Sequence, residues 1–184
     1  IAKDESGFIQ KFRENLDKAD DENLRKIQIV VRPHPSNYKH YQCLKGVPGI
    51  FLIPEKGAVP FGATEAAQLF YDTMYYSICG VGINTSAMIE TIIFGKPVIA
   101  VIDKKYEKTQ SETQHFRHLL AFDVLELANS NEELRRILKN LAYGNDTRAQ
   151  KRLRFLKSFI RPRGLDIPAS DLLAQKAEEI IQSG

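Results

Sequence analysis

At 184 residues, of which 43% are hydrophobic and 27% charged, the chain has material for one domain with a sizeable core and is typical of soluble globular proteins. No apolar run approaches the roughly 20 residues of a membrane span, and the net charge of +3 is too small to indicate a nucleic-acid partner. Because the chain starts at Ile1 without the apolar segment of a signal peptide, and has two cysteines in no metal-ligand spacing, we expect a cytoplasmic fragment of a longer protein.

Helices and strands are predicted to alternate along the chain. Phe8, Phe12, Leu16 and Ala19 recur at helical spacing and predict an N-terminal helix that ends before Asp20. Apolar runs, the first three of them closed by Pro or Gly, predict buried strands, over residues 27–31, 50–53, 76–80, 98–102 and 124–127. Helical spacing and capping residues predict further helices, over residues 64–75, 84–94, 111–120, 130–141, 148–159 and 170–181.

This alternation, with strands that are apolar throughout, predicts an α/β fold: a Rossmann-like open parallel sheet with helices on both faces. We expect one α/β domain over residues 1–184, in which 145–184 is a C-terminal helical extension.

The loop over residues 80–86, GVGINTS, is the strongest candidate for a ligand site, because ligands of open α/β sheets bind at the carboxyl ends of the strands. Its small residues let a ligand approach the backbone, and the amides and hydroxyls of Thr85 and Ser86 suit an anion. Glu90, one turn later, could accept hydrogen bonds from sugar hydroxyls. The alternative, that Asn84, Thr85 and Ser86 only cap a helix and Glu90 is solvated, stays open.

Two other loops are predicted at the same edge. Arg32 and His34 follow the first strand, where an arginine fork can bind phosphate and a histidine can donate to an oxyanion, although a lone loop histidine is more often structural. The loop 103–111 carries Lys104, Lys105 and Tyr106, which could close over a ligand or form an ordinary charged surface.

A dinucleotide-binding motif is a weaker interpretation of the same loop. Gly80 and Gly82 precede a helix, and Asp103 ends the next strand about 20 residues on, as that motif requires. Thr85 occupies the third glycine position, however, and its side chain would obstruct close packing there.

The segment 80–101, GVGINTSAMIETIIFGKPVIAV, resembles the C-terminal nucleotide-binding domain of GT-B glycosyltransferases, where a Ser/Thr-rich turn, a glutamate one turn later and a GKPV close are continuous. RPHP at 32–35 resembles the histidine-proline motif of capsule-type enzymes, including CDP-glycerol glycerophosphotransferases and transferases of CMP-activated Kdo or sialic acid. The resemblance covers about residues 27–141. Epimerases of UDP-N-acetylglucosamine share a similar segment, so the donor stays open.

The resemblance implies that Thr85 and Ser86 bind donor phosphate, that Glu90 holds ribose hydroxyls, and that His34 acts as the catalytic residue at the phosphate or leaving oxygen. Residues after Ile53 and Pro54 would border the base, and no metal or cofactor is implied. The whole donor-nucleotide site expected is Arg32, His34, Pro54, Gly82, Asn84, Thr85, Ser86 and Glu90.

The function implied is the nucleotide-sugar or nucleotide-polyol binding half of a glycosyltransferase in bacterial surface polysaccharide synthesis. Such enzymes have an N-terminal acceptor-binding domain that usually provides the general base, so this chain alone should bind but not transfer. An epimerase-like isomerase and a non-catalytic nucleotide-binding module remain alternatives. The basic stretch 148–163 is expected to form a solvated face opposite Leu153, Leu156 and Ile160, or to contact anionic lipid of the inner membrane peripherally.

Overall fold

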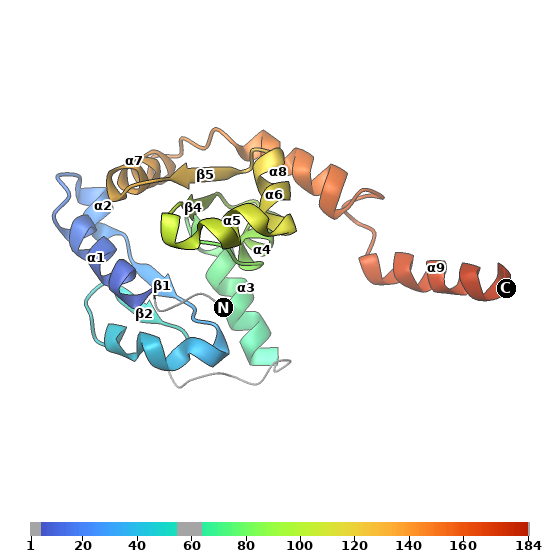
Figure 1. Cartoon of the computed structure of the whole chain (residues 1–184), viewed down its shortest axis with the longest axis horizontal. Coiled ribbons are helices and arrows are strands. Elements are labelled where there is room, and N and C mark those ends of the chain that lie inside the picture. Colours follow the sequence, from blue (N-terminus) through green and yellow to red (C-terminus); the bar gives the residue numbers. More distant parts are fainter. Residues whose placement is uncertain (1–4, 55–63, 184) are drawn as a thin grey trace.

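The structure is a computed structural model that describes residues 5–54 and 64–183. All its strand pairs are parallel and fall into two sheets (Figure 1). β1 (Ile29–Val31) pairs with β2 (Ile50–Leu52), whereas β3 (Gly80–Gly82), β4 (Val98–Val101) and β5 (Leu125–Ala128) pair in chain order. The predicted parallel α/β class is confirmed and is compatible with a Rossmann-like fold, but the strands divide between two small sheets instead of forming one.

The three-stranded sheet has helices on both faces, as expected. Because successive side chains of a strand point to opposite faces, Ile99 of β4 packs on one side and Val98 and Ala100 on the other. The first face is covered by α1 (Ser6–Asp17), α2 (Glu22–Lys26) and α7 (Asn131–Ala142). The second is covered by α4 (Ala87–Ile93), α6 (Gln114–Ala121) and α8 (Ala149–Phe155).

A contact between distant parts of the chain holds α2 against α7. The side chain of Asp21 caps α2 by accepting from the N–H groups of Asn23 and Leu24 at 3.0 and 3.3 Å. From α7, the Tyr143 hydroxyl donates to Asp21 at 3.2 Å and Lys139 pairs with it at 2.9 Å. The hydrogen bond of Lys139 outweighs desolvation and lowers the pKa of Asp21.

The two-stranded sheet is covered by the 3-10 helix η1 (Pro35–Leu44), which the sequence did not predict. Tyr41 and Leu44 of this helix pack on β1 and β2. On the opposite face Val30 and Phe51 are 45% and 47% exposed. The prediction that both strands are buried on both faces is therefore wrong.

The strand predicted over 76–80 is wrong in position, since α3 (Thr64–Tyr75) is followed by an exposed Tyr76 and the strand begins at Gly80. β3 lies unusually close to α4. A Cβ at position 80 would stand 3.1 Å from the Thr91 side chain, and one at position 82 would stand 3.3 Å from Met88 Cε. The close packing therefore favours glycine at both positions, and because glycine has a low strand propensity, the sequence pattern does not predict this strand.

Gly80→Ala is expected to lower the free energy of unfolding by about 1–2 kcal/mol, because the added methyl forces Thr91 and α4 outward. The matched control is Gly7→Ala in α1, where an added Cβ meets nothing within 4 Å. That control should raise stability by roughly 0.5–1 kcal/mol through helix propensity. Urea unfolding of both variants gives the comparison, and two changes of equal sign would contradict the close packing of α4.

The single helix predicted over 111–120 is divided. The 3-10 turn η2 (Lys104–Tyr106) leads into α5 (Glu107–Glu112), and α6 begins at Gln114. Between them Thr113 is extended, with φ −83° and ψ 131°. Its hydroxyl donates to the Thr109 carbonyl at 2.8 Å and accepts from Asn84, so the break fixes Thr113 beside the end of β3.

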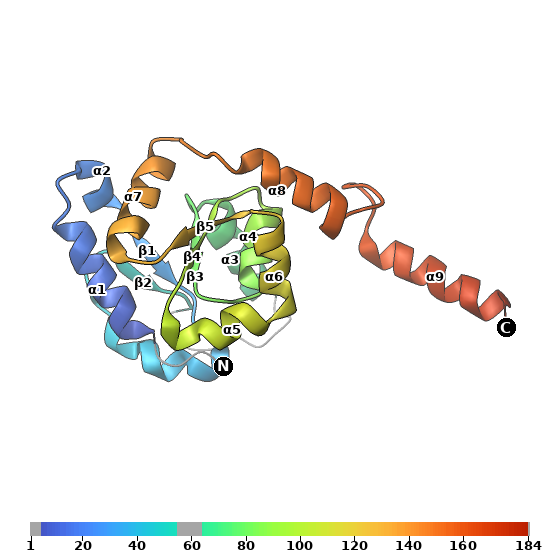
Figure 2. The ribbon, with the colours of Figure 1, turned by 45° about the horizontal axis from the view of Figure 1, so that its top comes forward.

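The C-terminal region contains α8, a π-helical continuation η3 (Leu156–Ile160), and α9 (Ala169–Ser183), which stands away from the body (Figure 2). The face predicted for the basic stretch is partly wrong, because Arg152 is 2% exposed while Leu153 is 38% exposed. None of the helices described is long and apolar enough to cross a membrane.

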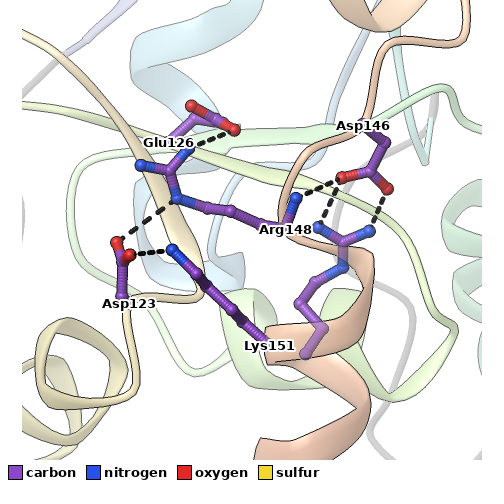
Figure 3. Close-up of polar contacts among 6 residues, drawn as sticks. Asp123, Glu126, Asp146, Arg148 and Lys151 are labelled. Carbon is purple, nitrogen blue, oxygen red and sulfur yellow. Dashed lines mark hydrogen bonds and ion pairs between the residues drawn. The ribbon is translucent and has the colours of Figure 1, made fainter.

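Ion pairs account for that orientation of α8 (Figure 3). Arg152 pairs with Asp146 through both terminal nitrogens and also reaches the Gly95 carbonyl at 3.4 Å. Arg148 pairs with Asp123 at 3.3 Å and with Glu126 of β5 at 2.5 Å. These partners hold Arg148 and Arg152 toward the sheet, whereas Arg154 stays exposed.

Candidate functional site

The loop 83–86 leaves β3 at the carboxyl edge of the three-stranded sheet and leads into α4. Thr85 and Ser86 are exposed, and within the described ranges no partner accepts from their backbone N–H groups. The Thr85 hydroxyl accepts from the Ala87 N–H at 3.3 Å, whereas the Ser86 side chain makes no capping bond. Of the residues expected to cap α4, only Thr85 does so, through this one long hydrogen bond.

Glu90 and Gly82 flank this loop. Glu90 is half-buried, and its backbone N–H donates to the Ser86 carbonyl at 3.3 Å, which places it one turn beyond the loop. No ion pair holds its carboxylate within the part of the chain described. The absence of a side chain at Gly82 accommodates Met88 and the Thr85 methyl, so this glycine serves the packing of the loop.

Asn84 connects the loop to the segment after β4. Its Nδ2 donates to the Thr109 carbonyl at 2.5 Å and to the Thr113 hydroxyl at 2.9 Å. Its Oδ1 lies 2.6 Å from Nε2 of His115, in the first turn of α6. The Asn84 side chain is thus engaged by the protein itself and positions the neighbouring segment.

Gln110 ties the same segment to both strands. It is 5% exposed, and its Nε2 donates to the carbonyls of Ile83 and Val101 at 2.9 and 2.7 Å. Carbonyls only accept, so the amide orientation is fixed and Oε1 is the atom left without a partner. A buried acceptor without a partner is uncommon in native proteins.

Arg32 is directed toward α3. Its Nη1 donates to the Leu69 carbonyl and to the Thr73 hydroxyl, both at 3.2 Å, and its guanidinium lies over the Phe70 ring at 4.8 Å. Burial lowers the pKa of this guanidinium from its ordinary value. Arg32 therefore joins β1 to α3 in this structure.

His34 begins η1. Its Nδ1 accepts from the Ser36 N–H at 3.3 Å and lies 2.7 Å from the Ser36 hydroxyl. This places the ring proton of neutral His34 on Nε2 and leaves the ring exposed. Pro54 follows β2, and the residues after it that were expected to border a base lie outside the described ranges.

The predicted site residues fall into two groups. Arg32, His34 and Pro54 follow strands of the two-stranded sheet, whereas the loop 83–86 and Glu90 follow β3. Among the described residues, no hydrogen bond or ion pair joins one group to the other. Of the loop after β4, Asp103 caps η2 by accepting from Lys105 at 2.8 Å, and Lys104 and Lys105 are exposed.

The structure bonds four residues after β4 to the loop, namely Thr109, Gln110, Thr113 and His115. Sequence reading placed Thr109 and Gln110 in the loop 103–111 without naming them as site residues, and it missed Thr113 and His115. A signal for them existed. They follow β4, which is the parallel neighbour of β3, and loops after neighbouring parallel strands meet at one edge.

Comparison with protein-family models, curated proteins and solved structures finds nothing that matches the chain. Among the described residues, no three His, Cys, Asp or Glu side chains are grouped to hold a metal ion. Burial raises the pKa of the Cys79 thiol to about 12, which keeps it protonated and unreactive at neutral pH. The groups that the structure brings together at this edge are backbone amides, hydroxyls and an imidazole.

Proposed function

We propose that this chain is the donor-binding half of a glycosyltransferase, and that it binds the nucleotide of an activated sugar or polyol at the loop after β3. The observation that carries the proposal is that the exposed residues Thr85 and Ser86 have backbone N–H groups with no acceptor among the described residues, beside a Ser86 hydroxyl that makes no capping bond. Glu90 one turn later and the order of the segment 80–101 support it, because both agree with the GT-B resemblance.

The chemistry proposed is stabilisation of the leaving nucleotide. As the donor bond breaks, negative charge develops on the phosphate oxygens, and preorganised N–H and O–H donors stabilise that charge. Thr85 and Ser86 supply such donors, and Glu90 accepts from ribose hydroxyls. The Nε2–H of His34 would serve the leaving oxygen only if its exposed ring reaches the loop in the complex.

The proposal predicts a thermal shift with a pyrimidine nucleotide. We expect CMP, CDP, UMP or UDP, at 100 times its Kd, to add about 2.7 kcal/mol and raise the melting midpoint by roughly 5–10 °C, whereas GDP and ADP do not. Glu90→Ala should reduce the shift because the ribose contact is lost. Glu178→Gln, an exposed carboxylate variant on α9, is the control and should leave the shift unchanged.

Repeating the measurement with EDTA and then with Mg²⁺ tests the expectation of metal-independent binding. Dependence on Mg²⁺ would contradict that part of the proposal. If no nucleotide shifts the midpoint of the unmodified chain, the donor-binding function is wrong and a module without a nucleotide site takes its place.

A further inference from the structure

The orientation of the Asn84 amide is fixed by its partners. A carbonyl oxygen can only accept, so the atom facing the Thr109 carbonyl must be Nδ2. The Thr113 hydroxyl gives its own proton to the same carbonyl and accepts from Asn84, which agrees with this assignment. The other atom of the amide, Oδ1, is therefore the one that faces His115.

That orientation determines the tautomer of His115. Since Oδ1 of Asn84 is an acceptor, the Nε2 atom 2.6 Å away must carry a proton. Nδ1 then holds the lone pair of the neutral ring, and no described residue is bonded to it. Protonation of Nδ1 would add a second N–H donor and a positive charge without breaking the Asn84 contact.

The ring is held close to the candidate loop. Asn84 immediately precedes Thr85 and Ser86, and Gln110 clamps the segment before α6 to the carbonyl of Ile83 at 2.9 Å. The unpartnered Oε1 of Gln110 is buried beneath the same segment, so a polar group is incompletely satisfied here. Asn84 thus positions a half-buried imidazole at the carboxyl edge of β3 and β4, and Gln110 holds the segment that precedes it.

We infer that His115 is a ligand-contacting residue of this site, which takes up a proton from water at Nδ1 when the ligand binds and donates it to an anionic oxygen of the ligand's phosphate. Asn84 is the positioning residue that keeps the Nε2–H of His115 turned toward the protein. The inference rests on the proposed nucleotide site and adds a residue from a different strand loop. The charge-assisted hydrogen bond to phosphate then comes from the protonated Nδ1 of His115, in the segment after β4, and adds to the contacts from the loop after β3.

The test compares two changes at one position. In His115→Gln the side-chain amide keeps a donor that can reach Asn84 but loses the group at Nδ1, whereas His115→Ala loses both. Binding of CDP and UDP is measured by titration calorimetry. We expect both variants to bind roughly 10- to 100-fold more weakly than the unmodified chain, which is the range for one charge-assisted hydrogen bond. His118→Gln, one turn later on α6 and packed on Phe159, is the control and should bind normally.

A second measurement does not depend on a variant. In the ¹⁵N-histidine-labelled chain, the Nδ1 resonance of His115 should shift on addition of CDP or UDP and should not shift with cytidine or uridine, which lack phosphate. The free chain should show the Nε2–H tautomer, and Asn84→Ala should reduce that preference.

The outcomes separate this inference from the proposed function. If CDP or UDP binds, Ser86→Ala weakens the binding, and His115→Gln has no effect, the role of His115 is wrong while the nucleotide site stands. A His115 Nδ1 resonance that does not shift when the chain is saturated with CDP or UDP would also contradict the role of His115. If neither probe binds the unmodified chain, both fail together.

Discussion

Replacing Phe155 with alanine is expected to lower the free energy of unfolding by about 3–5 kcal/mol. Its ring is fully buried in the cluster that joins α8 to β4, β5, α4 and α6. It also lies 5.1 Å from the Phe122 ring and 5.2 Å from the Phe159 ring, measured between centroids. Removal leaves a cavity that rigid neighbours cannot fill. Urea unfolding should show the loss, and the melting midpoint should fall by roughly 6–20 °C.

Phe159→Ala is the matched control for this prediction. Phe159 lies one turn later in η3 and stacks on Phe155, but it is 40% exposed. Its removal should cost roughly 1 kcal/mol, because water already reaches the ring. Equal losses for the two variants would mean that Phe155 is not the side chain that anchors α8.

The second large effect is expected at the ion pair of α8. Asp146→Ala should lower the free energy of unfolding by about 3 kcal/mol, because it leaves the guanidinium of Arg152 buried without a counter-charge. We take the lower end of the range for broken buried pairs, since Asp146 is 26% exposed. Arg154→Ala, an exposed arginine on the same helix, should change stability by less than about 0.5 kcal/mol.

The same pair gives a pH dependence. Burial raises the pKa of Asp146, but the hydrogen bond and charge of Arg152 outweigh it and hold the pKa below its ordinary value of 3.8. The stabilisation of the folded state by this ion pair is therefore complete above pH 3.8, and it is lost as the pH falls through the lowered pKa of Asp146 in the folded state. In Asp146→Asn this part of the acid destabilisation should be absent. An unchanged acid profile would contradict the pairing.

The elements with strong apolar patterns could be predicted from the sequence. The runs that became β1, β2, β4 and β5 were placed within two residues of their observed starts, because apolar β-branched runs closed by Pro or polar turns have few other structures. β3 could not be placed, since two of its three residues are glycines selected by the approach of α4. The break at Thr113 also depends on a distant residue, Asn84, and leaves no local signal.

For the candidate site, pattern reading singled out the loop 80–86 and Glu90. In the structure Thr85 and Ser86 are exposed and Glu90 is half-buried. It did not foresee that Arg32 would be engaged by α3 or that Asn84 would bond within the protein. Both outcomes depend on which side chains meet across the fold. His115 was missed because the sequence does not show that a single histidine in a helix contacts Asn84, and that contact is what places it at the site.

The contact of Asp21 with Tyr143 spans 122 positions of sequence, and it bears on how the chain folds during synthesis. At translation rates of about 5–20 residues per second, α1 and α2 exist for roughly 6–24 s before α7 is made. Throughout that interval Phe12 and Leu16 lack one of the helices that bury them in the finished fold. The nascent chain therefore exposes part of this apolar stripe to water until α7 has been synthesised.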